Sequence, residues 1–410
     1  MNDKSFPKVI YVLLFVISIW TLANFFNEQK PSHPLLNEST TKIAFIEIWG
    51  NYSNTVKLFD EIIEPEVNQY AQEHNANMTF DFIVVQPQDG GPDVNKKIQE
   101  LHKSGIRYII GSNCVACAAY SFIRDNDMML ISSRSTQSLF SIEDEHMFRV
   151  CPPDQLTGQV LNKMLKSKGI THVAVLRRGD NWADEVYNGF TELWGTDNIL
   201  VDIRYSHDAI NFGKELGEIS DALSASVSNG VSIDDVGVIA LCFAEIEPIV
   251  NEATSFPLLM EVAWFGSEST AWLDQSKYID SISGFDRLGV YSPIYTVAGN
   301  NKWENLAERY QGLTGEHPDR DVGYDYDAAW LMALTIMESG SHDRKTLAEA
   351  LPGVASSYVG ATGMIGLDEY GDRDNAPYDI VGYVLENNET ICLIVGYYDG
   401  ETQEVSWYTP

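Results

Sequence analysis

The chain has 410 residues and a formal net charge of −32. This length is enough for two lobes, each with a core of its own. The acidic residues are spread along the chain and do not gather in one tail, a pattern that fits solubility better than a specific cationic partner. A surface of this charge repels nucleic acid and anionic lipid headgroups, so we expect no nucleic-acid partner.

The first element in chain order is an apolar run from Val9 to Phe26, with Lys4 and Lys8 just before it. Its length is about the minimum for a membrane-spanning helix, and the lysines place its N-terminus in the cytoplasm. A cleaved signal peptide is the alternative, but no clear small-x-small cleavage pattern follows, so we favour an uncleaved anchor. Residues 1–26 are thus a predicted signal-anchor or signal segment, and residues 27–41 a linker. The rest is expected outside the cell membrane, or secreted if the segment is cleaved.

Patterns typical of strands and helices then alternate with regularity. Apolar runs typical of buried strands fall at residues 42–49, 79–86, 107–111 and 128–132, and helices are predicted between them at 55–73, 93–103 and 114–124. Alternation of this kind implies a parallel sheet with helices on both faces. The first part of the chain is therefore predicted to form a doubly wound α/β unit.

A second series of similar size begins after Pro152 and Pro153. Helices are predicted at 155–166, 182–193, 212–227 and 246–254, and strands at 172–177, 199–205, 236–242 and 261–266. The last third adds helices at 301–313 and 326–338 and strands at 378–385 and 390–396. A chain that completes one lobe and returns to the other crosses between them several times, and several crossings make a hinge.

Motifs for catalysis, metal binding and cofactor binding are missing from the sequence. The eight histidines form no HExxH or HxH spacing, and there is no Gly-x-Ser-x-Gly, Walker A or Gly-x-Gly-x-x-Gly stretch. Cys114 and Cys117 form a CxxC pair at a predicted helix start, where redox pairs occur, but the usual neighbouring Trp and Pro or Lys are absent. We favour a structural disulfide or buried thiols, and expect no enzyme, metal or cofactor.

Seven short segments in a specific order and spacing carry a resemblance to a known family. They are GIRYIIG (105–111), MLISSRST (129–136), FRVCPPD (148–154), GDNWADE (179–185), WFGSE (264–268), YDYDAA (324–329) and TGMIGLDEYGDR (362–373). Over residues 42–400 the chain resembles the type I periplasmic binding proteins, specifically the branched-chain-amino-acid receptors of ABC transporters. The resemblance implies two doubly wound parallel-sheet lobes joined by a multi-strand hinge. The N-terminal lobe would hold residues 42–152 plus 292–377, and the C-terminal lobe 153–291 plus 378–410.

The family's ligand contacts fall on loops at the carboxyl ends of strands, where open α/β sheets bind ligands. The resemblance implies that residues 133–136 hold a ligand carboxylate, that Glu268 holds the ligand's amine, and that aromatic side chains form the walls. The residues it assigns to the site are Tyr52, Ser112, Asn113, Arg134, Ser135, Thr136, Trp182, Glu268 and Tyr324. For each there is a plainer alternative, because hydroxyls cap helices, a loop Glu is usually solvated, and aromatics are often core residues.

Arg134 departs from the family, where a small residue is common. Its guanidinium would favour a second acidic group on the ligand, or it could pair with Asp180 or Glu268 and be structural. We predict an extracytoplasmic solute-binding protein that captures a small amino-acid-like ligand and delivers it to an ABC transporter permease. A ligand-sensing receptor subunit is the first alternative, and a thiol-redox protein using Cys114 and Cys117 the second.

Overall fold

The computed structural model describes residues 39–48, 50–88, 91–112, 115–137, 141, 146–271, 289–386 and 389–408. The predicted anchor at Val9–Phe26 lies outside these ranges, as do Asn113 and Cys114. Among the helices within them, none is both long and apolar enough to cross a membrane. The anchor therefore stays a prediction.

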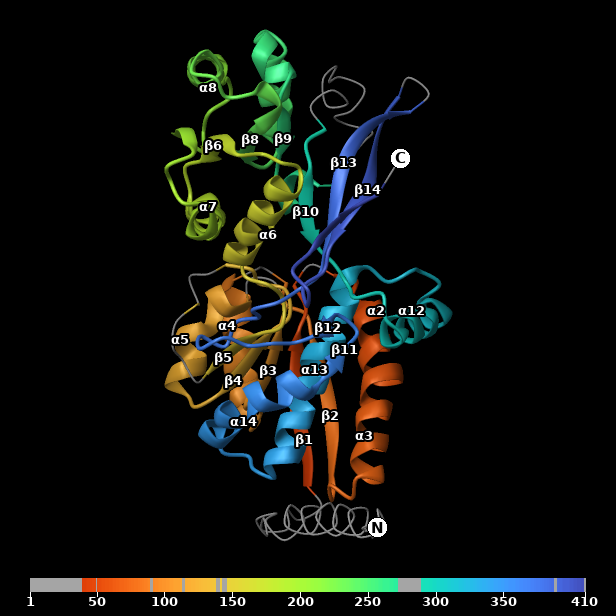
Figure 1. Ribbon diagram of the computed structural model, residues 1–410. Coiled ribbons are helices and arrows are strands. Elements are labelled where there is room, and N and C mark those ends of the chain that lie inside the picture. The colour runs from red at the N-terminus through yellow and green to blue at the C-terminus, as the bar shows by residue number, and fades with distance from the viewer. Residues whose placement is uncertain are drawn as a thin grey trace, which may run out of the picture.

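The first parallel sheet has the strand order β2-β1-β3-β4-β5. Its central strands are buried on both faces, which explains their continuous apolar sequence. Helices cover both faces (Figure 1). The strands are β1 (Ser39–Ile46), β2 (Met78–Val85), β3 (Tyr108–Gly111), β4 (Met129–Ser132) and β5 (Met147–Arg149), and the helical segments are α2 (Tyr52–Lys57), η1 (Leu58–Ile63), α3 (Glu64–Glu73), α4 (Gly91–Lys103) and α5 (Val115–Asp125).

The second parallel sheet has the order β7-β6-β8-β9. Its strands are β6 (His172–Arg178), β7 (Ile199–Tyr205), β8 (Val236–Leu241) and β9 (Ala263–Phe265). Its helical segments are α6 (Asp154–Ser167), α7 (Asn181–Trp194), α8 (Gly213–Ser228), η3 (Ile233–Asp235), α9 (Ile246–Ala253), η4 (Pro257–Met260) and η5 (Glu268–Thr270). Two parallel α/β units thus follow one another along the chain, as the alternating pattern predicts.

An antiparallel sheet of order β10-β13-β14-β15 runs beside the second unit and toward the first (Figure 1). Between β10 and β13 the chain returns to the first unit, where α13 contacts β3, β4 and α3. The elements are β10 (Ser292–Tyr295), α12 (Asn301–Thr314), α13 (Arg320–Ser339), α14 (Arg344–Ser357), β11 (Val359–Gly360), β12 (Gly363–Met364), β13 (Tyr378–Glu386), β14 (Glu389–Tyr398) and β15 (Val405–Trp407). We call β1–β5 with their helices and α12–α14 the N-terminal lobe, and β6–β9 with their helices the C-terminal lobe.

Helix α13 begins six residues earlier than the sequence pattern predicted. Asp319 caps it by accepting a hydrogen bond from the backbone N–H of Val322 at 3.4 Å. The apolar periodicity is weak in this first turn, which contains Arg320 and Asp321, so the pattern hid it. The earlier start matters because it places these two charged residues at the helix N-terminus, facing the site described below.

The segment 362–373, which carries part of the family resemblance, anchors the returning chain. Arg149 in β5 donates to Asp372 at 2.6 Å, and both side chains are almost fully buried. Arg373 donates to the backbone oxygens of Val150, Thr362 and Met364. These bonds fix the two guanidinium groups beside the crossing between the lobes.

Candidate functional site

The candidate site begins with a hydrogen bond between two residues of the C-terminal lobe. The indole Nε1 of Trp182, at the start of α7, donates to Oε1 of Glu268 at 2.9 Å. The Trp182 ring also stacks on Phe243, with centroids 4.3 Å apart. The three residues follow β6, β9 and β8, so they gather at the carboxyl edge of this sheet, where parallel sheets bind ligands.

Asp154 lies next to this pair, in the first turn of α6. It is 1 % exposed, and no well-aligned hydrogen bond reaches its carboxylate from the described residues, although the hydroxyl of Thr136 lies close enough to favour its charged form. The buried Oε2 of Glu268 likewise makes no hydrogen bond to a described residue. Burial, and then the charge of Glu268, raise the pKa of Asp154 to about 8, although the nearby hydroxyl of Thr136 opposes the shift. Burial also raises the pKa of Glu268.

The N-terminal lobe contributes Thr136 and Arg320 to the same region. The backbone oxygen of Thr136 accepts a hydrogen bond from the N–H of Asp154 at 2.8 Å, which joins the loop after β4 to α6. The guanidinium of Arg320 lies over the ring of Tyr295 at 4.3 Å, and its charge lowers the pKa of Glu268 against the effect of burial. Its Nε makes no hydrogen bond to any described residue but lies 3.7 Å from Oδ1 of Asp321, so the guanidinium is part of an ion pair.

Two buried carboxyl groups therefore lie together where the lobes meet, with the guanidinium of Arg320, which is ion-paired with Asp321, close enough to lower the pKa of Glu268. Ionising a buried carboxyl group is costly, and a ligand that brings a positive charge to the two carboxyl groups recovers part of that cost. An ammonium group would pair with Glu268 and Asp154, and an anionic group would pair with Arg320. The arrangement is suited to binding a small zwitterion.

Arg134 makes its contacts inside the N-terminal lobe. Its guanidinium donates to Asp325 through Nε at 3.1 Å and to Glu47 through Nη2 at 3.1 Å, and a second bond joins Nη2 to Asp325. Asp321 lies 3.6 Å from Nη1. The sequence had offered Asp180 or Glu268 as ion-pair partners, and this was wrong, because the early start of α13 brings Asp321 and Asp325 to Arg134 instead.

Three other predicted site residues have structural bonds of their own. The hydroxyl of Ser112 is buried and donates to the backbone oxygen of Ile46 at 2.9 Å, which ties β1 to the end of β3. The N–H of Ser135 donates to the hydroxyl of Ser132, and Tyr324 is fully buried and donates to the backbone oxygen of Thr296. Their role in ligand binding stays a prediction.

The remaining predicted residues are Tyr52 and Asn113. Tyr52 is 41 % exposed at the start of α2, and its hydroxyl donates to the backbone oxygen of Val84 at 3.4 Å. Asn113 is outside the described residues. Of the predicted set, the structure brings together Trp182 and Glu268 directly and places Thr136 beside them.

Sequence reasoning missed Asp154, Phe243 and Arg320 as site residues. Asp154 ends the segment FRVCPPD, and Phe243 stands just beyond a strand of the second sheet, so their positions carried a usable signal. Arg320 carried none, because its place depends on where α13 begins.

The cysteines show no sign of a reactive centre within the described residues. Cys151 and Cys242 are buried, and burial raises the pKa of Cys151 to about 12, which disfavours a thiolate. Cys117 is exposed and its Sγ donates to Oε1 of Gln137 at 3.0 Å. The described residues also contain no group of three or more His, Cys, Asp or Glu placed to hold a metal ion.

Comparison with known proteins assigns the family. The model of the receptor family ligand binding region matches residues 67–386. The chain therefore belongs to this family of ligand-binding proteins, which has the type I periplasmic binding fold. An uncharacterized protein of Methanocaldococcus jannaschii is 23 % identical over 383 residues, which cover 87 % of this chain and 88 % of that protein.

Solved structures agree on the fold. An ABC transporter substrate-binding protein from Desulfitobacterium hafniense superposes with a TM-score of 0.64 at 17 % identity, covering 87 % of this chain and 100 % of that one. A putative branched-chain amino acid ABC transporter protein from Rhodospirillum rubrum gives 0.62 at 16 % identity, with 87 % and 100 % covered. A leucine binding protein from Thermotoga maritima gives 0.56 at 18 % identity, with 88 % and 99 % covered.

Proposed function

We propose that this protein is an extracytoplasmic solute-binding protein that captures a small amino-acid-like zwitterion between its two lobes. The observation that carries this proposal is the Trp182–Glu268 pair, whose second carboxylate oxygen makes no hydrogen bond to a described residue and lies buried near Asp154. In a family that binds ligands, two buried carboxyl groups at the lobe junction are a place for a ligand amine, whose positive charge favours their ionised form. The positive charge of the ligand amine would then pair with the carboxyl groups of Glu268 and Asp154.

The ligand's carboxylate has two candidate partners. The sequence pointed to the loop 133–136, but the N–H groups of Ser133 and Ser135 donate to Gly111 and Ser132 within the lobe. Two groups stand beside the acidic pair: the hydroxyl of Thr136, which is near Asp154, and the guanidinium of Arg320, whose Nε is 3.7 Å from Asp321 and makes no hydrogen bond to a described residue. We infer that Arg320 and Thr136 hold the carboxylate, while Glu268 and Asp154 hold the amine.

Ligand binding at the lobe junction would favour a closed arrangement of the lobes. A ligand that contacts both lobes shifts the equilibrium between open and closed forms, and the size of the shift is set by how much more tightly it binds the closed form. Crystal structures of related proteins include a Desulfitobacterium hafniense ABC transporter substrate-binding protein in complex with Leu. The role that fits these relatives is delivery of the ligand to an ABC permease. Residues 1–26 would then be an uncleaved membrane anchor, with the two lobes outside the membrane. A sensor subunit using the same site is the alternative.

The test is a thermal-shift screen of the full-length chain in a nonionic detergent against amino acids, their amides and the matching amines and acids. A ligand that binds only the folded state raises the melting temperature. We expect shifts from α-amino acids and none from compounds that lack either charge. Equal shifts from the amino acid and its deaminated acid would reject the proposed amine site.

A further inference from the structure

A cavity is built into the N-terminal lobe, away from the candidate site at the lobe junction. It has a volume of about 470 Å³ and lies between α3, α13 and α14, with the start of α12 at one side. Tyr326, Trp330, Leu334 and Glu338 line it from α13 at intervals of four residues, which places them on one helix face. None of the residues that form the candidate site described above lines it.

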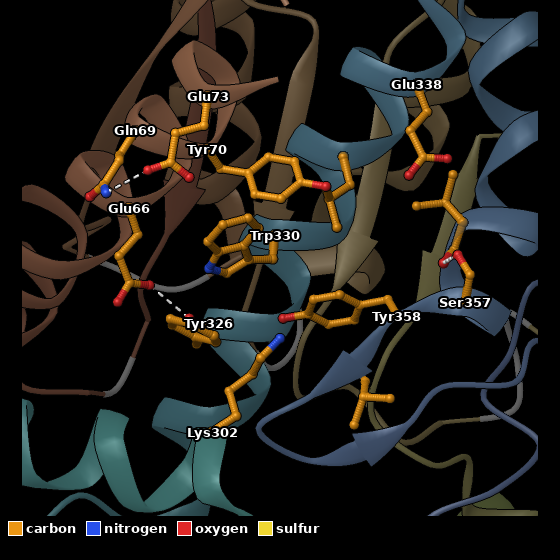
Figure 2. Close-up of a pocket in the computed structure, with 13 residues that line it drawn as sticks. Glu66, Gln69, Tyr70, Glu73, Lys302, Tyr326, Trp330, Glu338, Ser357 and Tyr358 are labelled. Atoms are coloured by element: carbon orange, nitrogen blue, oxygen red, sulfur yellow. Dashed lines mark hydrogen bonds between the residues drawn. The ribbon is translucent and has the colours of Figure 1, made fainter. Parts of the chain in front are cut away.

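The walls of this cavity are aromatic. Trp330 lies at the centre, with Tyr70, Tyr326 and Tyr358 around it (Figure 2). Tyr70 meets Trp330 edge to face at 5.6 Å, and Tyr326 is tilted against it at 6.2 Å. The hydroxyls of Tyr326 and Tyr358 are held by Glu66 and Asp327, at 2.7 Å and 3.0 Å. The rings are therefore fixed before any ligand arrives.

An ammonium group of the protein already occupies part of this aromatic cavity. The Nζ of Lys302 lies over the ring of Tyr358 at 4.1 Å and over Trp330 at 6.0 Å. Burial lowers the pKa of Lys302, because removing water from the ammonium group disfavours its charged form. The negative charge of Asp327 also acts on this ammonium group and favours its charged form.

The surroundings are acidic as well as aromatic. Glu73 and Glu338 are exposed at the rim, and Glu66 lines the cavity while pairing with Arg309. Aromatic faces attract cations, and a quaternary ammonium has no N–H donors that such walls would leave unsatisfied. A ligand of that kind suits the cavity better than the lysine that fills it now.

We propose that this cavity is a second ligand site, an aromatic cage that binds a quaternary ammonium compound in place of the Lys302 ammonium. The ligand cation sits against Trp330, Tyr70 and Tyr358, and the carboxylates at the rim raise its local concentration. Lys302 acts as an internal competitor for the same rings. The site is separate from the lobe junction, so its ligand binds whether or not an amino acid is bound there.

The test uses choline as the probe and its neutral isostere 3,3-dimethyl-1-butanol as the control compound, titrated by calorimetry into the full-length chain at constant ionic strength. We expect choline to bind more tightly than the isostere by about two- to thirtyfold, the range of a cation–π contribution. Replacing Lys302 by Met removes the competitor, so Lys302→Met should strengthen choline binding. The matched variant Lys345→Met, an exposed lysine of α14, should leave it unchanged.

Variants of the rings and of the junction complete the test. Trp330→Leu should abolish choline binding, and Tyr70→Leu, at a partly buried position, provides the same test if Trp330→Leu does not fold. Glu268→Gln should leave choline binding unchanged, because it alters only the other site. The proposal is overturned if the isostere binds as well as choline, if Lys302→Met weakens choline binding, or if Glu268→Gln abolishes it.

Discussion

The indole N–H of Trp182 and the carboxylate of Glu268 are joined at 2.9 Å, and this bond leaves the other oxygen of Glu268 buried without a partner among the described residues. The indole N–H thus orients the carboxylate, whose pKa is raised by burial. The ring of Trp182 is itself held by stacking on Phe243. An oriented carboxyl group with one oxygen left to accept a hydrogen bond is suited to recognising an ammonium group, whose charge favours the ionised form.

Replacing Glu268 by Gln keeps the shape of the side chain and removes its charge. A hydrogen bond to a charged group is worth roughly 1.5–3 kcal/mol, so affinity for an α-amino acid should fall by about ten- to a hundredfold. Calorimetry measures the change, and Glu308→Gln, at an exposed position of α12, is the matched control. Unchanged affinity in Glu268→Gln would show that the amine lies elsewhere.

Asp154 should make stability fall as the pH rises. Its folded pKa of about 8 lies above the usual value, so between pH about 4 and about 8 the folded protein keeps a proton that the unfolded chain has lost. Each such proton contributes up to about 1.4 kcal/mol per pH unit, and the loss is complete above the folded pKa. Urea unfolding of the ligand-free protein across this range measures the slope. Asp154→Asn should flatten it, and an equal slope in both proteins would contradict the buried, protonated state.

Arg134 should be essential for stability. Replacing it by Met leaves Glu47 and Asp325 buried without their common counter-ion, a change that costs about 3–5 kcal/mol for a broken buried pair. Arg204→Met, at a partly exposed ion pair with Asp184, should leave the unfolding midpoint nearly unchanged. If Arg134→Met is stable but binds leucine better than wild type does, Arg134 contacts the ligand as the sequence suggested.

The crossing of α6 and α7 should tolerate no side chain at Gly189. A Cβ there would lie 1.9 Å from the backbone oxygen of Gln155, so Gly189→Ala must push the helices apart. We expect a loss of about 1–3 kcal/mol or more in stability and weaker ligand binding, because Asp154 and Trp182 begin these two helices. Gly312→Ala in α12, where a Cβ meets nothing within 4 Å, should be neutral or stabilising. Equal effects of the two substitutions would contradict the close approach.

The sequence by itself determined the α/β alternation, the two parallel units and the family resemblance, because hydrophobic period and turn residues are local properties of the chain. It also pointed to Glu268 and Trp182, since both stand at positions where parallel sheets present side chains to a ligand. Only the tertiary structure decided which charges meet. Asp154 of α6 lies near Glu268 because α6 crosses α7 closely at Gly158 and Gly189, and α7 carries Trp182, which is bonded to Glu268. Arg134 is bound by Glu47 and Asp325 because α13 packs against β3 and β4. Which charged partner a side chain meets depends on residues from distant parts of the chain, and a local sequence pattern carries no information about those residues.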